Sequence, residues 1–164
     1  TDQPVEAVGL EGQESRNRPR ATHLVIDLVG TYGAAGATTG GSEYFAITPE
    51  RLVDSRVGLG GVAGPVLNTA DTVVTFAGRG SVPAAAAITA IDLNVTIVGP
   101  TEAGHTTAWP TGPRPDVSML NFRQGEVVPN RTLLGLAAGT GRLWSAASAV
   151  HYIADASGWY GPAL

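Results

Sequence analysis

Residues 90–98 read Ala90-Ile91-Asp92-Leu93-Asn94-Val95-Thr96-Ile97-Val98, so that apolar and polar side chains alternate along the whole segment. Successive side chains of a β-strand point to opposite faces of the sheet, and the alternation therefore predicts a half-buried strand over 88–98. The side chains expected in the core are Ile91, Leu93, Val95 and Ile97. Those expected on the opposite face are Asp92, Asn94 and Thr96.

Other segments of the chain have the same strand character. They are 43–47, 72–77, 105–109, 117–122, 132–137, 142–145 and 150–156. Turns rich in the 22 Gly and 11 Pro separate them at intervals of about ten residues. The glycines of 133–150 disfavour a helix there. These features predict an all-β protein, an antiparallel β-sandwich of many short strands with either jelly-roll or immunoglobulin-like topology.

The composition excludes several classes of function. Cysteine and lysine are both absent, which excludes disulfides, thiolate metal sites and Schiff-base chemistry. The net charge of −4 does not favour binding to nucleic acid, which is itself negatively charged. No run of about 18 apolar residues occurs, so we expect no membrane span. We expect neither a cofactor nor a metal ion.

An internal repeat is the strongest signal of domain organisation. Residues 21–33 resemble residues 149–161 at an offset of 128, with six of thirteen positions identical and no gap. Such a period has the size of a domain. Residues 1–33 are then the C-terminal strands of a preceding repeat, 34–42 a Gly/Ala/Thr linker, and 43–164 a complete sandwich module. The alternative is that 1–33 completes the same sandwich. In that case residues 21–33, which we call the first tail, pair with residues 149–161, the second tail, as a symmetry-related strand.

A family resemblance begins at residues 44–56, Tyr44-Phe45-Ala46-Ile47-Thr48-Pro49-Glu50-Arg51-Leu52-Val53-Asp54-Ser55-Arg56. This segment is similar to the F-x-P-x-x-P-x-R-L-L-D-T-R opening of repeat domains in secreted actinobacterial proteins, from which it departs at Val53 and Ser55. The matching motifs continue in order to the closing Ile153-Ala154-Asp155-x-x-Gly158-Trp159-Tyr160, so the resemblance covers 44–161.

The resemblance implies a β-rich, non-catalytic module at the cell surface or outside the cell, found in tandem and often appended to cell-wall hydrolases. It carries over no catalytic residue. We therefore expect a structural or surface-display repeat that self-assembles by strand exchange, with neighbouring copies as partners. The alternative function is a carbohydrate- or cell-wall-binding module, with cell-wall glycan as the partner.

Charged residues of the opening and closing motifs are the candidate structural residues. Arg51, Asp54 and Arg56 suit a loop clamp between arginine and carboxylate, or alternatively a contact to a sugar or carboxylate ligand. His and Asp recur in both tails, as His23 with Asp27 and as His151 with Asp155. Within one strand the two side chains of a pair lie about 13 Å apart, at roughly 3.3 Å per residue, and cannot bond to each other.

Candidate ligand-binding residues come from two sets. Asp92, Asn94 and Thr96 form a polar row that suits a glycan or Ca²⁺, or is simply a solvated sheet face. Trp109 and Trp159, together with Trp144, could stack on sugar rings, or lie buried as tryptophan usually does. No G-x-S-x-G, H-E-x-x-H or phosphate-loop motif occurs, and no catalytic residue is assigned.

Overall fold

The structure is a computed structural model that describes residues 26, 28, 30–31, 41–84 and 88–162. Within these residues the chain forms strands and no helix, which confirms the all-β prediction. The strands are β1 (Glu43–Asp54), β2 (Val66–Leu67), β3 (Thr72–Thr75), β4 (Ala90–Val98), β5 (Gly104–Trp109), β6 (Leu120–Phe122), β7 (Val127–Gly135), β8 (Thr140–Ser145) and β9 (Ala149–Gly161).

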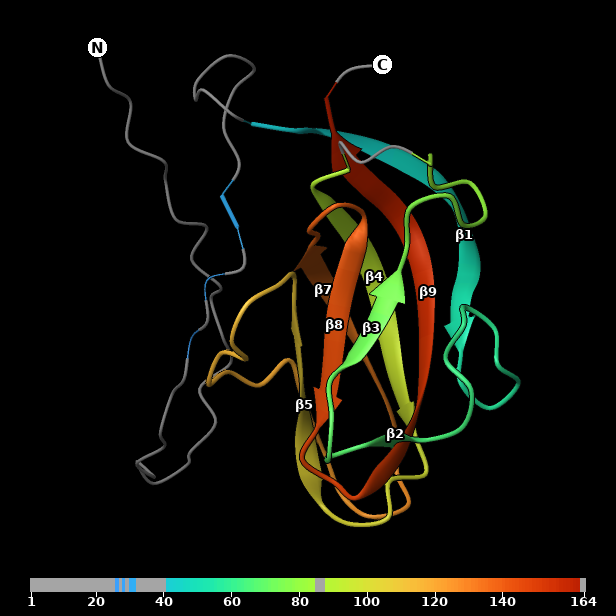
Figure 1. The fold of residues 1–164 in the computed structure, drawn as a ribbon, viewed down its shortest axis with the longest axis vertical. Coiled ribbons are helices and arrows are strands. Elements are labelled where there is room, and N and C mark those ends of the chain that lie inside the picture. The colour runs from blue at the N-terminus through green and yellow to red at the C-terminus, as the bar shows by residue number, and fades with distance from the viewer. Residues whose placement is uncertain (1–25, 27, 29, 32–40, 85–87, 163–164) are drawn as a thin grey trace, which may run out of the picture.

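Two antiparallel sheets pack face to face as a β-sandwich (Figure 1). The large sheet has the order β1-β9-β4-β7, with β2 added at the start of β9, and the small sheet has the order β3-β8-β5-β6. The pairs β1–β9, β3–β8, β4–β7 and β5–β6 are nested one inside the next along the chain. Nested pairs of this kind arise when one long antiparallel hairpin is folded over into two sheets, which is the jelly-roll topology.

The core lies between the two sheets, and β4 shows how the sequence builds it. Its apolar side chains, Ile91, Leu93, Val95 and Ile97, are at most 1% exposed, as the alternation predicted. On the opposite face Asn94 and Thr96 are half-buried. Asp92 on that face is only 2% exposed, because side chains of β1 and β7 cover it.

Several strands are longer than the segments predicted from the sequence. β1 continues through Pro49 to Asp54, with a register shift between Ala46 and Glu50 where proline interrupts the pairing. β7 begins at Val127 and includes Pro129, which an edge strand tolerates. The short β2 has no sequence signal of its own.

Strand β9 is the most extensively paired strand of the large sheet. It pairs with β1 along one edge, with β4 along the other, and with β2 at its first two residues. A register shift between Asp92 and Leu93 places Ser157 in a bulge of β9. The closing motif of the sequence therefore lies in the interior of the sheet, beside the opening motif on β1.

Candidate functional site

An arginine–carboxylate pair joins the opening motif to the closing motif across β1 and β9. Arg51 and Asp155 are register partners, and Arg51 donates from Nε to Asp155 Oδ1 at 2.8 Å and from Nη2 to Oδ2 at 3.2 Å. The hydrogen bond to Asp155 is the main cause that raises the pKa of Arg51. The pair is partly open to water, with side chains 45% and 28% exposed.

A second pair holds the turn that follows β1. The Asp54 carboxylate accepts hydrogen bonds from the Arg56 backbone N–H at 3.1 Å, from Nε at 2.9 Å and from Nη2 at 2.7 Å. These bonds lower the pKa of Asp54 to about 2, chiefly through the Arg56 side chain. Arg51 Nη1 lies 3.6 Å from Asp54 Oδ2 and links the two pairs.

Ser55 completes the contact between the two motifs. Its backbone N–H donates to the Tyr152 carbonyl at 2.9 Å, and its Oγ accepts from the Tyr152 N–H at 3.0 Å. The same Oγ lies 3.0 Å from His151 Nδ1. Ser55 is fully buried, so this Ser–His contact ties β9 to the turn and presents no hydroxyl to solvent.

The structure thus brings together the candidate structural residues that it describes, which are Arg51, Asp54, Arg56, His151 and Asp155. We call their contacts, together with Ser55, the motif clasp. His151 and Asp155 do not bond to each other but to separate residues of the opening motif. Their counterparts His23 and Asp27 lie outside the described residues.

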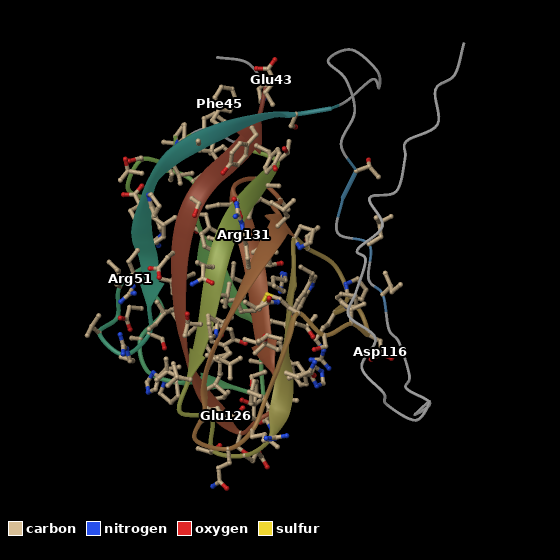
Figure 2. The ribbon with its side chains drawn as sticks, turned by 180° about the vertical axis from the view of Figure 1, so that it is seen from behind. Glu43, Phe45, Arg51, Asp116, Glu126 and Arg131 are labelled. Atoms are coloured by element: carbon tan, nitrogen blue, oxygen red, sulfur yellow. The ribbon has the colours of Figure 1, made fainter. Side chains whose placement is uncertain are left out.

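A third charge pair occupies the outward face of the large sheet. Arg131 on β7 donates to Asp92 on β4 from Nε at 2.9 Å and also from Nη2. The Tyr44 hydroxyl reaches the same carboxylate from β1 at 3.1 Å and lies 3.2 Å from the Ser157 carbonyl. Asp92 thereby ties the two edge strands of this sheet to β4. Figure 2 shows Arg131 and Arg51 on this face.

Gly158 makes the Tyr44–Asp92 contact possible. Tyr44 must cross β9 to reach β4, and a Cβ placed on Gly158 would overlap the Tyr44 hydroxyl and ring. The Tyr44 ring also packs against Tyr160 on β9, with centroids 5.0 Å apart and planes tilted by 48°. The absence of a side chain at Gly158 therefore leaves the space in which Tyr44 crosses β9.

We call Asp92, Arg131 and Tyr44 the Asp92 cluster. A pocket of about 530 Å³ opens beside it. Its lining runs from Tyr44 and Tyr160 past the Asp92–Arg131 pair to the edge of β7 and residues 117–119. Asn130 of β7 fixes that last segment by donating from Nδ2 to the Met119 carbonyl at 2.6 Å. The volume lies within the range of about 300–1,000 Å³ that is typical of ligand pockets.

The candidate tryptophans lie elsewhere. Trp109 is 3% exposed and donates to the Gly112 carbonyl at 3.1 Å. Trp159 is 4% exposed and stacks on Phe45 with ring centroids 4.2 Å apart. Neither ring offers a free face to a ligand. Trp144 is half-buried on the small sheet, where the Arg114 guanidinium lies 3.6 Å above its ring.

The remaining members of the polar row, Asn94 and Thr96, lie half-buried on the outward face of β4. Asn94 is flanked in register by Asp155 on β9 and Arg131 on β7. One polar row therefore crosses the large sheet from the motif clasp to the Asp92 cluster. The described part of the chain holds no group of three or more His, Cys, Asp or Glu side chains that could bind a metal ion.

The pocket residues Tyr44 and Arg131, and Gly158 beneath the Tyr44 ring, had no role assigned from the sequence. Tyr44 and Gly158 stand within the motifs of the family resemblance, but Arg131 carries no local signal. Only the antiparallel register of β4 and β7 brings Arg131 within reach of Asp92.

Comparison with known proteins does not assign this chain to a family. No protein-family model matches the chain, and no curated protein is significantly similar to it. The described residues contain no helix that is long and apolar enough to cross a membrane.

Proposed function

We propose that this chain is a non-catalytic, extracellular repeat module that assembles with neighbouring copies of itself into a surface structure. Residues 43–161 are one repeat, and residues 21–33 are the closing strand of the repeat before it. The observation that carries the proposal is that five of the six positions shared by 21–33 and 149–161 lie where β9 contacts β1 or the turn that follows β1; the sixth, Ala149, pairs with β2.

The contacts of the shared positions support this interpretation. His151 bonds to Ser55, Asp155 binds Arg51, and Gly158 and Tyr160 accommodate the Tyr44 ring. The equivalent positions of the first tail carry His23, Asp27, Gly30 and Tyr32. By contrast, no identity falls on the inward-facing core positions Val150, Tyr152, Ala154, Ala156 or Trp159. The first tail therefore carries the residues that recognise an opening strand, with a different set of core residues behind them.

Exposed apolar side chains in the first tail also support the proposal. Ile26 and Leu28 are 80% and 83% exposed, whereas their counterparts Ala154 and Ala156 are at most 1% exposed. Burying a side chain of this size contributes about 1.5–3 kcal/mol. Ile26 and Leu28 thus favour insertion into the core of another module.

The pairing of β9 argues against the alternative, in which the two tails lie side by side within one sandwich. Both long edges of β9 are already taken, by β1 on one side and by β4 on the other. A first tail with the same contact residues is therefore suited to a β1-like strand of another repeat or of another copy.

Light scattering on the full chain over a wide range of concentration tests this function. We expect self-association, and we expect the double variant Ile26→Asp/Leu28→Asp to abolish it. Val57→Asp is the matched control, because Val57 is also exposed, at 77%, but lies outside the repeated segment. A chain that stays monomeric at every concentration contradicts the proposal, as does association that survives the double variant.

A truncation distinguishes the two domain interpretations. Removing residues 1–33 should leave the thermal unfolding midpoint of the remaining sandwich unchanged, because those residues belong to a different repeat. A clear fall in the midpoint would assign residues 1–33 to this sandwich instead.

A further inference from the structure

We propose that the pocket beside Tyr44 and Tyr160 is a binding site for a neutral saccharide. The described residues that line it fall within 44–160, so its binding can be measured separately from the self-association that residues 26 and 28 mediate. It also differs from the tryptophan sites that the sequence suggested.

The charge balance of the pocket selects an uncharged ligand. Asp92 and Arg131 are the only charged side chains among the described residues that line it, and they neutralise each other. Both Nε and Nη2 of Arg131 are committed to Asp92. A carboxylate or phosphate ligand would therefore meet an ion pair with no net positive charge, next to the Asp92 carboxylate, and removing its charge from water there is unfavourable.

The arrangement of aromatic and polar groups suits a sugar ring. Tyr44, which is 43% exposed, and Tyr160 form a tilted pair at one end of the pocket, against which the C–H face of a pyranose can pack. Beside them the Arg131 fork offers the Nη1 donors, which its two bonds to Asp92 do not use. Adjacent sugar hydroxyls can accept from such a planar group while they donate to neighbouring oxygens.

The polar groups are held in place before any ligand arrives. Asp92, whose side chain is 3% exposed, fixes the Arg131 guanidinium through two bonds and orients the Tyr44 ring through a third. Asn130 holds residues 117–119 as the opposite wall. Preorganisation of this kind reduces the entropy lost on binding.

Isothermal titration calorimetry of the full chain with cellotetraose, xylotetraose, maltotetraose and chitotetraose tests the proposal. We expect saturable binding of at least one of them. Tyr44→Ala should weaken that binding by about tenfold or more, because it removes the packing surface and one of the bonds to Asp92. Ser118→Trp should abolish it by filling the pocket from a partly exposed position.

Two controls make the result specific. Trp144→Ala removes a half-buried aromatic ring of the small sheet that does not line the pocket, and should leave the affinity unchanged. The Ile26→Asp/Leu28→Asp variant should bind the saccharide as the wild type does, which separates this site from self-association. Circular dichroism of each variant establishes that the sandwich is intact.

Three outcomes overturn the proposal. The first is the absence of binding to all four neutral oligosaccharides. The second is binding only to tetragalacturonate or to a proline-rich peptide, which would assign the pocket to an anion or a protein segment. The third is saccharide binding that Ser118→Trp leaves intact, which would place the ligand elsewhere on the surface.

Discussion

Asp54 and Asp92 are both buried carboxylates held by two side-chain bonds from an arginine, yet they stabilise different parts of the fold. Asp54 is bound by Arg56, two residues later, and fixes the turn that ends β1. Asp92 is bound by Arg131, 39 residues later, and by Tyr44, 48 residues earlier. The first pair is a local clamp, whereas the second holds three strands together. The same chemistry therefore supports a turn in one place and the sheet beside a pocket in the other.

Asp92→Ala should produce the largest loss of stability in this comparison. The substitution removes bonds to a charged group from Arg131 and Tyr44, and hydrogen bonds to charged groups contribute about 1.5–3 kcal/mol. We expect the free energy of unfolding in urea to fall by about 2 kcal/mol, because the Arg131 side chain is 72% exposed and can return to water.

Asp116→Ala is the matched control for Asp92→Ala. Asp116 is an exposed carboxylate in the segment between β5 and β6 (Figure 2), and its removal should change stability by less than about 0.5 kcal/mol. Equal effects of the two variants would show that Asp92 does not hold the strands together.

Gly158→Ala tests the Tyr44 contact alone, without a change of charge. The new methyl group would occupy the space of the Tyr44 ring, and Tyr44 would swing away from Asp92. The expected cost is about 1 kcal/mol, the usual net contribution of one hydrogen bond, measured by urea unfolding. Gly30→Ala is the control at the equivalent position of the first tail, where a Cβ would meet nothing within 4 Å. If both variants unfold alike, Gly158 is not required for the Tyr44 contact.

The contrast between the two carboxylates also explains what the sequence could predict. The Asp54–Arg56 clamp is local, so the residue types and their spacing were enough to suggest it. The alternation of residues 90–98 likewise predicted correctly which apolar side chains of β4 enter the core. Predictions of this kind succeed because the period of a strand is fixed by the backbone.

The Asp92 cluster could not be predicted because it depends on register between distant strands. Asp92 looked like part of a solvated row, and only the β4–β7 pairing brings Arg131 over it. Similarly, Trp159 could be assigned to a ligand or to the core until its stacking on Phe45 was known. A slip of one residue would reverse the face of every side chain on a strand, and a single sequence does not fix that choice.

Asp54 should have a smaller effect than Asp92, and one that depends on pH. Its pKa is about 2 in the folded protein, against an ordinary value of 3.8, so the unfolded chain takes up the proton first as pH falls. The stabilisation from Asp54 is complete above about pH 4 and is lost as pH falls towards about 2.

Urea midpoints at several pH values between 6 and 2 measure this dependence, with wild type compared to Asp54→Asn. The variant should lose less stability across the acid range, while the amide oxygen that it introduces can still accept from the Arg56 N–H. Glu102→Gln is a useful comparison, because bonds from Ser148 also lower the pKa of Glu102. Parallel pH curves for wild type and Asp54→Asn would contradict the assignment.

The smallest effect is expected for the exposed Arg51–Asp155 pair, and its size bears on the meaning of the repeat. A double-mutant cycle with Arg51→Ala and Asp155→Ala should give a coupling energy of about 0.2–1 kcal/mol, as for other exposed ion pairs, and added salt should reduce it. Such a value is too small to explain by stability alone why Asp stands at both 27 and 155. The pair would instead favour the correct opening strand in the correct register, since matched charges suppress wrong pairings. A coupling energy above about 2 kcal/mol would make the pair a main support of the β1–β9 interface, and the repeated aspartate would then need no role in strand selection.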